Sequence, residues 1–155
     1  MTDRNILSKT FTIDDLMRQF RVETTAKQFA GWVDRGSFRS AADSAGTAAT
    51  RQFSFRDGLC AALMAQHVSV ICVPSEAAAR LANQAAGEIM KSPAFKIITD
   101  PYNAPDDEYL LVIARADIWV VRVVRRDELD FTHAYTSLVI DISRLLRDIA
   151  QNLSS

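Results

Sequence analysis

The sequence predicts an α+β protein, and three observations lead to that prediction. Residues 11–68 contain three stretches in which apolar side chains recur at helical spacing. Residues 108–124 hold two runs of branched residues around a polar turn, the pattern of a β-hairpin. Residues 136–153 carry one long apolar stripe. A helical N-terminal head should therefore precede a helix, a small antiparallel sheet and a long C-terminal helix.

Composition indicates an ordinary globular protein. The 155 residues are 48% hydrophobic and 24% charged, with a formal net charge of −1. Residues 1–68 hold nine basic against seven acidic side chains, and the remainder holds nine against twelve. Because the whole chain has no general attraction for polyanions, nucleic-acid binding would require a local basic surface. No apolar run approaches the ~20 residues that span a bilayer, and we expect a cytoplasmic protein without a membrane partner.

The head has a cap signal at the start of each helix. These caps are Thr12, with Asp15 three residues later; Thr24 or Thr25; and Ser54, with Asp57 three residues later. Gly36 is placed to end the second helix in a left-handed conformation. Residues 40–50 (SAADSAGTAAT) contain no large apolar side chain, so we expect a surface loop there.

The second half should begin with a helix over residues 77–90 that Pro93 ends. Residues 95–99 (FKIIT) are then predicted to form a strand that joins the hairpin of residues 108–114 and 118–124. The last helix should begin near Thr136. Its stripe is expected to pack on the sheet or to pair two chains; the candidate dimer contacts are Leu138, Ile142, Leu145 and Ile149.

The chain is accordingly predicted to have two parts, a head at residues 11–68 and an α+β dimerisation or sensor region at residues 69–155. Two small helices followed by a returning third helix are a common construction for a DNA-binding head.

The head also resembles the winged helix-turn-helix of MerR-type proteins. The resemblance lies in TIDDLMRQF, then WVDRGSF, then RQFSFRD followed by an apolar helix, and it covers about residues 11–68. It implies that residues 25–32 form the recognition helix and residues 40–50 the wing. The side chains that would contact double-stranded DNA are Thr25, Lys27 and Gln28 at the groove, and Arg18, Arg21, Arg39 and Arg51 at phosphates.

The functional expectation is a sequence-specific transcription regulator that binds an inverted repeat as a homodimer. The alternative is a protein–protein module, an antiactivator or adaptor that has kept the head without DNA binding. The near-neutral head favours this alternative, as does Ala30 near the place of the family's usual arginine. In a further variant, the sheet binds a small-molecule effector.

Other chemistry has little support in the sequence. No nucleophile elbow, phosphate-binding glycine loop or metalloprotease helix occurs, so no enzyme activity and no cofactor are predicted. Cys60 and Cys72 lie in apolar runs and should be buried thiols. His67 and His133 lack metal-ligand spacing. Arg125 and Arg126 are interpreted as charges at a strand end, and the acids of residues 100–108 as a solvated loop.

Overall fold

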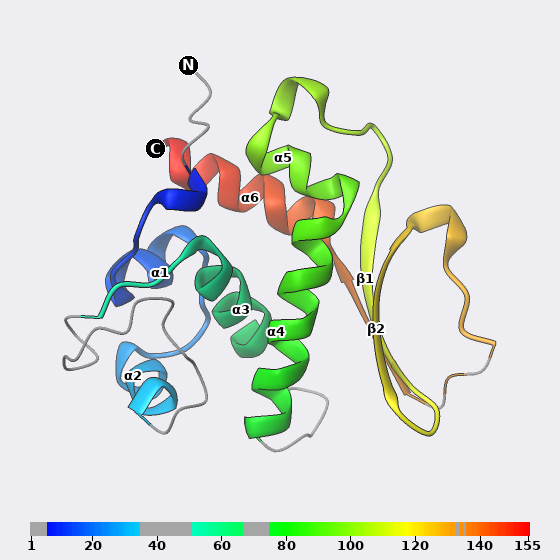
Figure 1. Cartoon of the computed structure of the whole chain (residues 1–155), viewed down its shortest axis with the longest axis horizontal. Helices are drawn as coiled ribbons and strands as arrows, with labels where there is room; N and C mark the ends of the chain where they lie inside the picture. The colour runs from blue at the N-terminus through cyan, green and yellow to red at the C-terminus, as the bar shows by residue number, and fades with distance from the viewer. Residues whose placement is uncertain (1–5, 35–50, 67–74, 133, 135) are drawn as a thin grey trace. The chain divides into compact units, whose positions relative to one another are not determined.

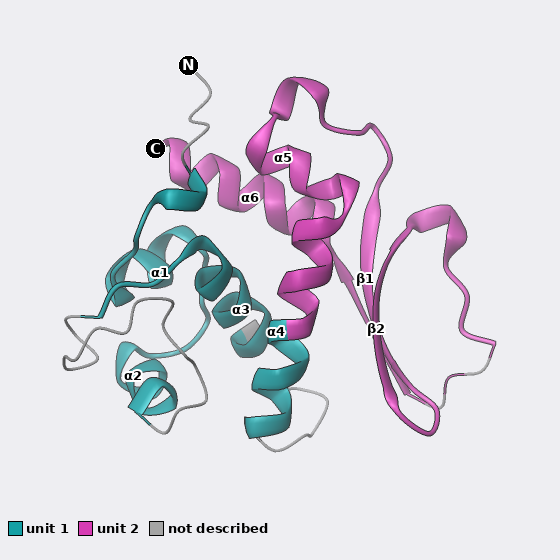
Figure 2. Cartoon of the chain, viewed as in Figure 1, with its two compact units in different colours: residues 1, 3–83 teal, residues 2, 84–155 magenta. Residues whose placement is uncertain are grey.

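The fold was analysed in a computed structural model, which describes residues 6–34, 51–66, 75–132, 134 and 136–155. Helices and a three-stranded antiparallel sheet make up this part of the chain, which confirms the α+β class (Figure 1). The chain divides into two compact units, of residues 1 and 3–83 (unit 1) and residues 2 and 84–155 (unit 2) (Figure 2). The expected boundary after residue 68 lies outside the described residues.

Unit 1 contains the three predicted head helices. They are α1 (Ile13–Gln19), α2 (Ala26–Asp34) and α3 (Phe55–Gln66), preceded by a short 3₁₀ helix, η1 (Ile6–Ser8). The first part of α4 (Ser75–Lys91) also belongs to unit 1. The loop of residues 40–50, Gly36 and Cys72 lie outside the described residues.

Each head helix begins with a reciprocal capping box; the sequence predicts the boxes of α1 and α3, and for α2 it predicts only a cap at Thr24 or Thr25. Thr12 N donates to Asp15 Oδ2 at 2.9 Å, and Asp15 N donates to Thr12 Oγ1 at 3.2 Å. Ser54 and Asp57 repeat this pair of bonds at 2.8 and 3.2 Å. In α2 the cap is Thr25, whose hydroxyl accepts from Gln28 N at 3.1 Å. These bonds satisfy amides that a helix start would otherwise leave without partners.

The core of unit 1 is a cluster of five phenylalanines, Phe11, Phe20, Phe29, Phe53 and Phe55, all at most 4% exposed. Phe20 meets Phe11 and Phe55 edge to face, each with 5.2 Å between ring centroids. Phe29 meets Phe53 at 5.5 Å. Phe11 and Phe53 also exchange two backbone hydrogen bonds of 2.8 Å in an antiparallel bridge. This bridge ties the chain before α1 to the chain before α3.

Unit 2 combines a sheet with helices. The strands are β1 (Tyr109–Arg115), β2 (Trp119–Arg125) and β3 (Thr136–Asp141), in the order β2-β1-β3 with antiparallel neighbours. The helices are the end of α4, η4 (Pro93–Phe95), α5 (Lys96–Thr99), η5 (Pro101–Asn103), η6 (Arg126–Glu128) and α6 (Ile142–Ser154). The helix at 77–90 and the hairpin are therefore confirmed.

Two predicted elements of this unit were wrong. Residues 95–99 form the end of η4 and the single turn of α5, not a strand. The third strand is instead β3, where a helix was expected. A short apolar run does not distinguish strand from helix by its spacing, and Pro93 at the first position of η4 favours a helical turn. The run TSLVID of β3 is rich in branched residues, which suit a strand.

The final helix consequently begins at Ile142. Asp141 is its N-cap and accepts a hydrogen bond of 2.9 Å from Arg144 N. Ile142, Leu146 and Ile149 are at most 1% exposed. The apolar stripe of α6 is thus largely buried within the chain itself.

Phe20 packs closely against Gly58 in α3, where the absence of a Cβ atom leaves room for the ring. A Cβ atom added at Gly58 would lie 2.7 Å from both Cε1 and Cζ of Phe20, well inside van der Waals contact. We expect Gly58→Ala to lower the free energy of unfolding by about 1–2 kcal/mol, although alanine ordinarily stabilises a helix relative to glycine. Urea denaturation followed by circular dichroism measures this change.

A double-mutant cycle with Phe20→Leu separates the steric cause from a general effect of Gly58→Ala. In the Phe20→Leu background the smaller side chain leaves room, so the cost of Gly58→Ala should largely vanish. An equal cost in both backgrounds, or a more stable Gly58→Ala protein, would show that the Phe20 ring does not limit residue 58.

Candidate nucleic-acid interface

The connection between α1 and α2 holds the most unusual backbone of the head. Phe20 ends α1, and Arg21 follows with φ of +50°. Val22 is buried at 4% exposure, and its carbonyl accepts from Thr24 N at 2.8 Å. The turn is therefore anchored by an apolar side chain, while Arg21 is exposed.

Arg21 is the one non-glycine residue at positive φ within the described part of the chain. Helix-turn-helix connections often have glycine in the turn, where no Cβ opposes this conformation. For an ordinary side chain the left-handed region costs about 1–2 kcal/mol. The chain thus accommodates a strained backbone at a position that presents a cation next to α2. Sequence spacing gave no signal of this conformation.

The first turn of α2 presents polar side chains to solvent. Thr25, Lys27 and Gln28 are exposed, whereas Phe29 and Val33 are buried. Trp32 is half-buried and meets Phe29 edge to face at 6.3 Å between centroids. Phe29 therefore belongs to the core of unit 1, and Trp32 packs at the edge of that core. The three predicted groove residues are therefore together on an accessible helix start.

Gln28 is already engaged in the cap of its own helix. Its Oε1 accepts from the Thr24 hydroxyl at 2.8 Å and from Thr25 N at 3.4 Å. Reading an adenine edge would require both the oxygen and the nitrogen of the amide. Contact with a base would therefore compete with the capping bonds, a cost that the sequence did not reveal.

The arginines that were predicted to contact phosphates differ in how exposed their side chains are. Arg18 is well exposed and pairs with Asp15 one helical turn away at 3.3 Å. Such an exposed pair contributes little and can exchange for a phosphate. Arg51 is half-buried, two residues before Phe53. Arg39 lies outside the described residues.

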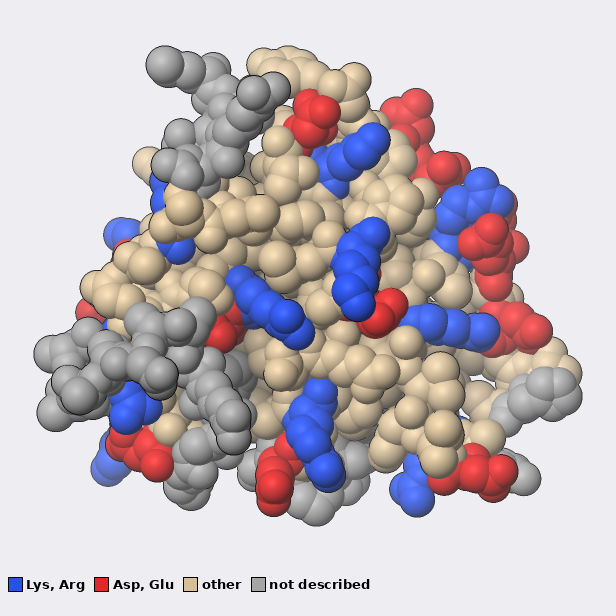
Figure 3. Space-filling model, viewed as in Figure 1, with Lys and Arg blue, Asp and Glu red and all other residues tan. Residues whose placement is uncertain are grey.

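The charge around these residues is balanced. From α1 to the end of α2, residues 13–34, three basic side chains face four acidic ones, including Glu23 and Asp34. Figure 3 shows acidic side chains beside several of the lysines and arginines on the face that it draws. Any attraction for a polyanion would come from a few individual basic side chains and not from a large surface of positive potential.

The predicted dimer contacts do not form one exposed surface. Leu138 lies on β3, and Ile142 and Ile149 are buried on α6. Leu145 is half-buried. Packing within the chain, the alternative that the sequence left open, accounts for the α6 stripe.

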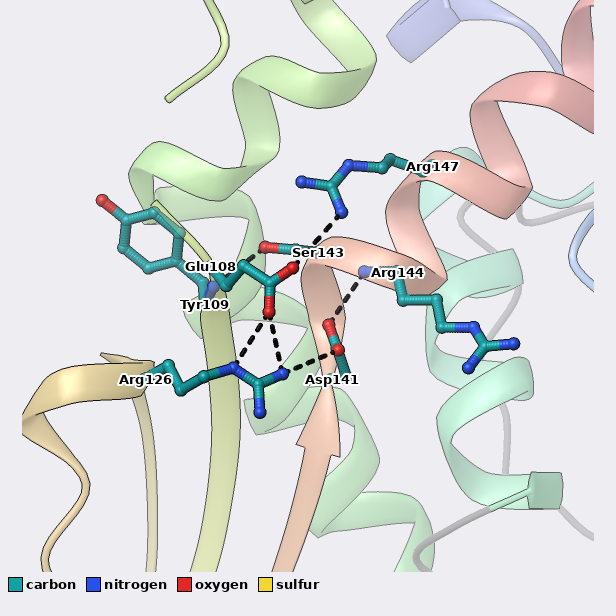
Figure 4. A network of polar contacts seen from close by, with 7 residues as sticks. All are labelled: Glu108, Tyr109, Arg126, Asp141, Ser143, Arg144 and Arg147. Carbon is teal, nitrogen blue, oxygen red and sulfur yellow. Dashed lines mark hydrogen bonds and ion pairs between the residues drawn. The ribbon is translucent and has the colours of Figure 1, made fainter. Parts of the chain in front are cut away.

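A polar network lies in unit 2, where the start of β1, the start of η6, the end of β3 and the start of α6 meet (Figure 4). Arg126 donates to Glu108 at 2.9 Å and to Asp141 at 3.1 Å. Arg147 lies 3.9 Å from Glu108. Arg126 N also donates to the carbonyl of Glu108 at 2.8 Å. These carboxylates and cations balance one another, so the network joins chain segments rather than offering a charged site.

Ser143 is the buried polar residue at this junction. Its Oγ accepts a hydrogen bond of 2.9 Å from Tyr109 N, at the start of β1 (Figure 4). The predictions from sequence missed this contact, because a serine in an apolar stripe does not reveal a partner 34 positions away.

The other candidate chemical groups give no site. Cys60 is buried, and burial raises the pKa of its thiol to about 12, so the reactive thiolate is suppressed. Within the residues that the structure describes, no three His, Cys, Asp or Glu side chains gather in a way that could hold a metal ion. His67 and His133 lie outside that part. Among the described helices, none combines the length and apolarity needed to cross a bilayer.

No sequence model of a known family matches the chain, and no curated protein matches it. The MerR-like resemblance therefore remains an expectation that rests on the head residues alone.

The cap of α1 should make stability depend on pH. The hydrogen bond from the Thr12 backbone N–H is the main cause that lowers the pKa of Asp15 below its ordinary 3.8; the Thr12 hydroxyl and Arg18 act in the same direction, and partial burial opposes them. A lowered folded-state pKa gives stability that is complete above the unfolded pKa and lost as pH falls through the folded value.

We expect Asp15→Asn to lose less than about 1 kcal/mol of unfolding free energy at neutral pH, since the site is partly exposed. The difference from wild type should be constant above about pH 5 and shrink below pH 3.8. Urea denaturation at a series of pH values measures it. A difference that persists at low pH would mean that the Asp15 charge does not stabilise the cap.

Removal of the Ser143 hydroxyl should leave the Tyr109 amide buried without its partner. We expect Ser143→Ala to lower the free energy of unfolding by about 1–3 kcal/mol. Ser154→Ala is the matched control in the same helix, because Ser154 is exposed and donates only to the Ala150 carbonyl at 2.9 Å. Equal effects of the two substitutions, measured by denaturant midpoint, would contradict the role of Ser143.

Proposed function

We propose that unit 1 is a helix-turn-helix head that binds double-stranded DNA, and that the chain is a transcription regulator. The observation that supports this most is the accessible start of α2, set beside an exposed arginine in the left-handed turn. In this proposal α2 enters the major groove with Thr25 and Lys27 toward base edges, while Arg18, Arg21, Arg39 and Arg51 hold phosphates.

The small number of basic side chains in the head predicts a low affinity of one head for DNA. Four phosphate contacts from one head would give a slope of about −3.6 in log K against log salt, because each contact contributes about −0.9. A fourfold rise in salt would then weaken binding by about two orders of magnitude. A single head would bind weakly at physiological salt, so useful affinity requires two heads on an inverted repeat.

The second candidate function is a protein–protein module with the same head. Two observations favour it: Gln28 is occupied in the cap of α2, and acidic residues outnumber basic ones from α1 to α2. The same accessible helix start would then contact a protein surface. The deciding experiment is fluorescence anisotropy of the full chain with a random-sequence duplex pool at several salt concentrations, followed by selection of bound sequences.

Lys27→Glu should weaken DNA binding by at least about tenfold, because it removes a cation from the base edges and adds an opposing charge. Lys96→Glu is the matched control, since Lys96 is exposed on α5 and the change in net charge is identical. Equal loss in both variants would indicate a response to net charge and not a DNA contact at α2.

Arg21→Asn tests the turn separately. Asparagine tolerates the left-handed region, so this substitution removes the cation without added backbone strain. We expect a severalfold loss of DNA affinity without a loss of stability, measured as an unfolding midpoint no lower than that of wild type. A wild-type chain that binds no duplex even at low salt would overturn the regulator proposal and favour the protein–protein module.

A further inference from the structure

The hydrogen bonds of Gln28 determine which end of its side-chain amide faces the cap of α2. Its Oε1 accepts from the Thr24 hydroxyl at 2.8 Å, and from N and Oγ1 of Thr25, each at 3.4 Å. Because a backbone N–H can only donate, the atom that faces Thr25 N must be the amide oxygen and not the amide nitrogen. The side chain as a whole is exposed. The oxygen of Gln28 is thus held in the cap at an accessible helix start.

The nitrogen of the same amide takes no part in the cap. Nε2 carries two N–H donors, and no acceptor for them lies among the residues that the structure describes. Lys27, the preceding residue, ends in an exposed ammonium group that has donors and no acceptor. Glu23, the exposed acid of the turn, precedes the cap residues and is not on the helix. The two long polar side chains in the first turn of α2 therefore both present donors.

Base edges in the major groove differ in how well they fit such donors. Guanine presents two adjacent acceptors, N7 and O6, whereas adenine presents the N7 acceptor beside the N6 amino donor. A glutamine that pairs with adenine uses its oxygen for that amino group, and here Oε1 would have to leave its bonds to Thr24 and Thr25. Guanine requires only Nε2. The competition between base contact and capping is therefore confined to bases whose amino group needs the oxygen.

We propose that Gln28 determines the sequence specificity of the head by selecting guanine through Nε2, while its Oε1 remains in the cap of α2. This inference rests on the proposed DNA binding and names the base that the head prefers. An amino group opposite Nε2 would set two donors against each other and leave both without a partner, which disfavours adenine. A well-placed contact of this kind changes affinity by about five- to a hundredfold between the right and the wrong base.

The experiment begins with duplexes that the full chain selects from a random-sequence pool, because these define the positions at which wild type prefers a base. Fluorescence anisotropy then measures affinity for the selected duplex and for duplexes in which one enriched G·C pair at a time is replaced by A·T. Wild type should enrich guanine and should lose about five- to a hundredfold in affinity on replacement of the pair that Gln28 contacts.

Gln28→Glu separates the two ends of the amide. A carboxylate still accepts from Thr24 and Thr25 and suits a helix start, but it has no N–H donor. We expect an unfolding midpoint no lower than that of wild type, and loss of the guanine preference at one position. The readout is the ratio of affinities for G·C and A·T, because the added charge weakens binding to every duplex. Gln151→Glu, exposed on α6 with the same change in charge, is the matched control and should keep every wild-type ratio.

The outcomes distinguish this inference from the proposed function. If wild type binds no duplex even at low salt, DNA binding and the guanine preference both fail. If wild type binds without base preference, enriches adenine at the position that Gln28→Glu alters, or shares every guanine preference with Gln28→Glu, DNA binding stands and the role of Gln28 is overturned. A Gln28→Glu midpoint well below that of wild type would also overturn it, because Oε1 would then not act simply as the acceptor in the cap.

Discussion

The close approach of Phe20 to Gly58 is the constraint on which the head depends. The Phe20 ring occupies the space where any residue other than glycine at position 58 would place its Cβ atom. The same ring packs edge to face against Phe11 and Phe55. Because Phe20 is also the C-cap of α1, this packing fixes where α1 ends and where the turn begins. The left-handed Arg21 follows at once, so the aromatic core determines how that arginine is presented.

The same core determines which side chains of α2 remain exposed for contact with a partner. Phe29 and Val33 are used inside unit 1, which leaves the polar side of the helix start for contact. The polar side carries Lys27 as its one lysine, and its Gln28 stabilises the cap of α2. Binding through such a surface gains little from each head, and the free energy would have to come from the repetition of heads on one target.

Local signals predicted the head well and unit 2 less well. The capping boxes of α1 and α3 and the cap of α2 follow from side chains close together in the chain, which a sequence displays directly. The strand expected at residues 95–99 and the helix expected from Thr136 were wrong, because their spacing fits both structures and distant pairing decides between them. Val139 joins a sheet through its pairing with Val112, 27 positions earlier, and no local pattern contains that information. For the candidate site, the exposure of Thr25 and Lys27 followed from helical spacing, whereas the engagement of Gln28 and the backbone of Arg21 did not.

The correction at Thr136 also changes where two chains could meet. Had residues 138–153 formed one helix, its stripe would have been long enough to serve both a sheet and a partner. In the structure the first residues of that stripe form β3; on α6, Ile142, Leu146 and Ile149 are buried, whereas Leu145 is half-buried. β3 instead forms an edge strand of the sheet, and its Val139 lies on the same face as Val112. The dimer contacts expected on one helical stripe are therefore divided between β3, which carries Leu138, and α6, which carries Ile142, Leu145 and Ile149.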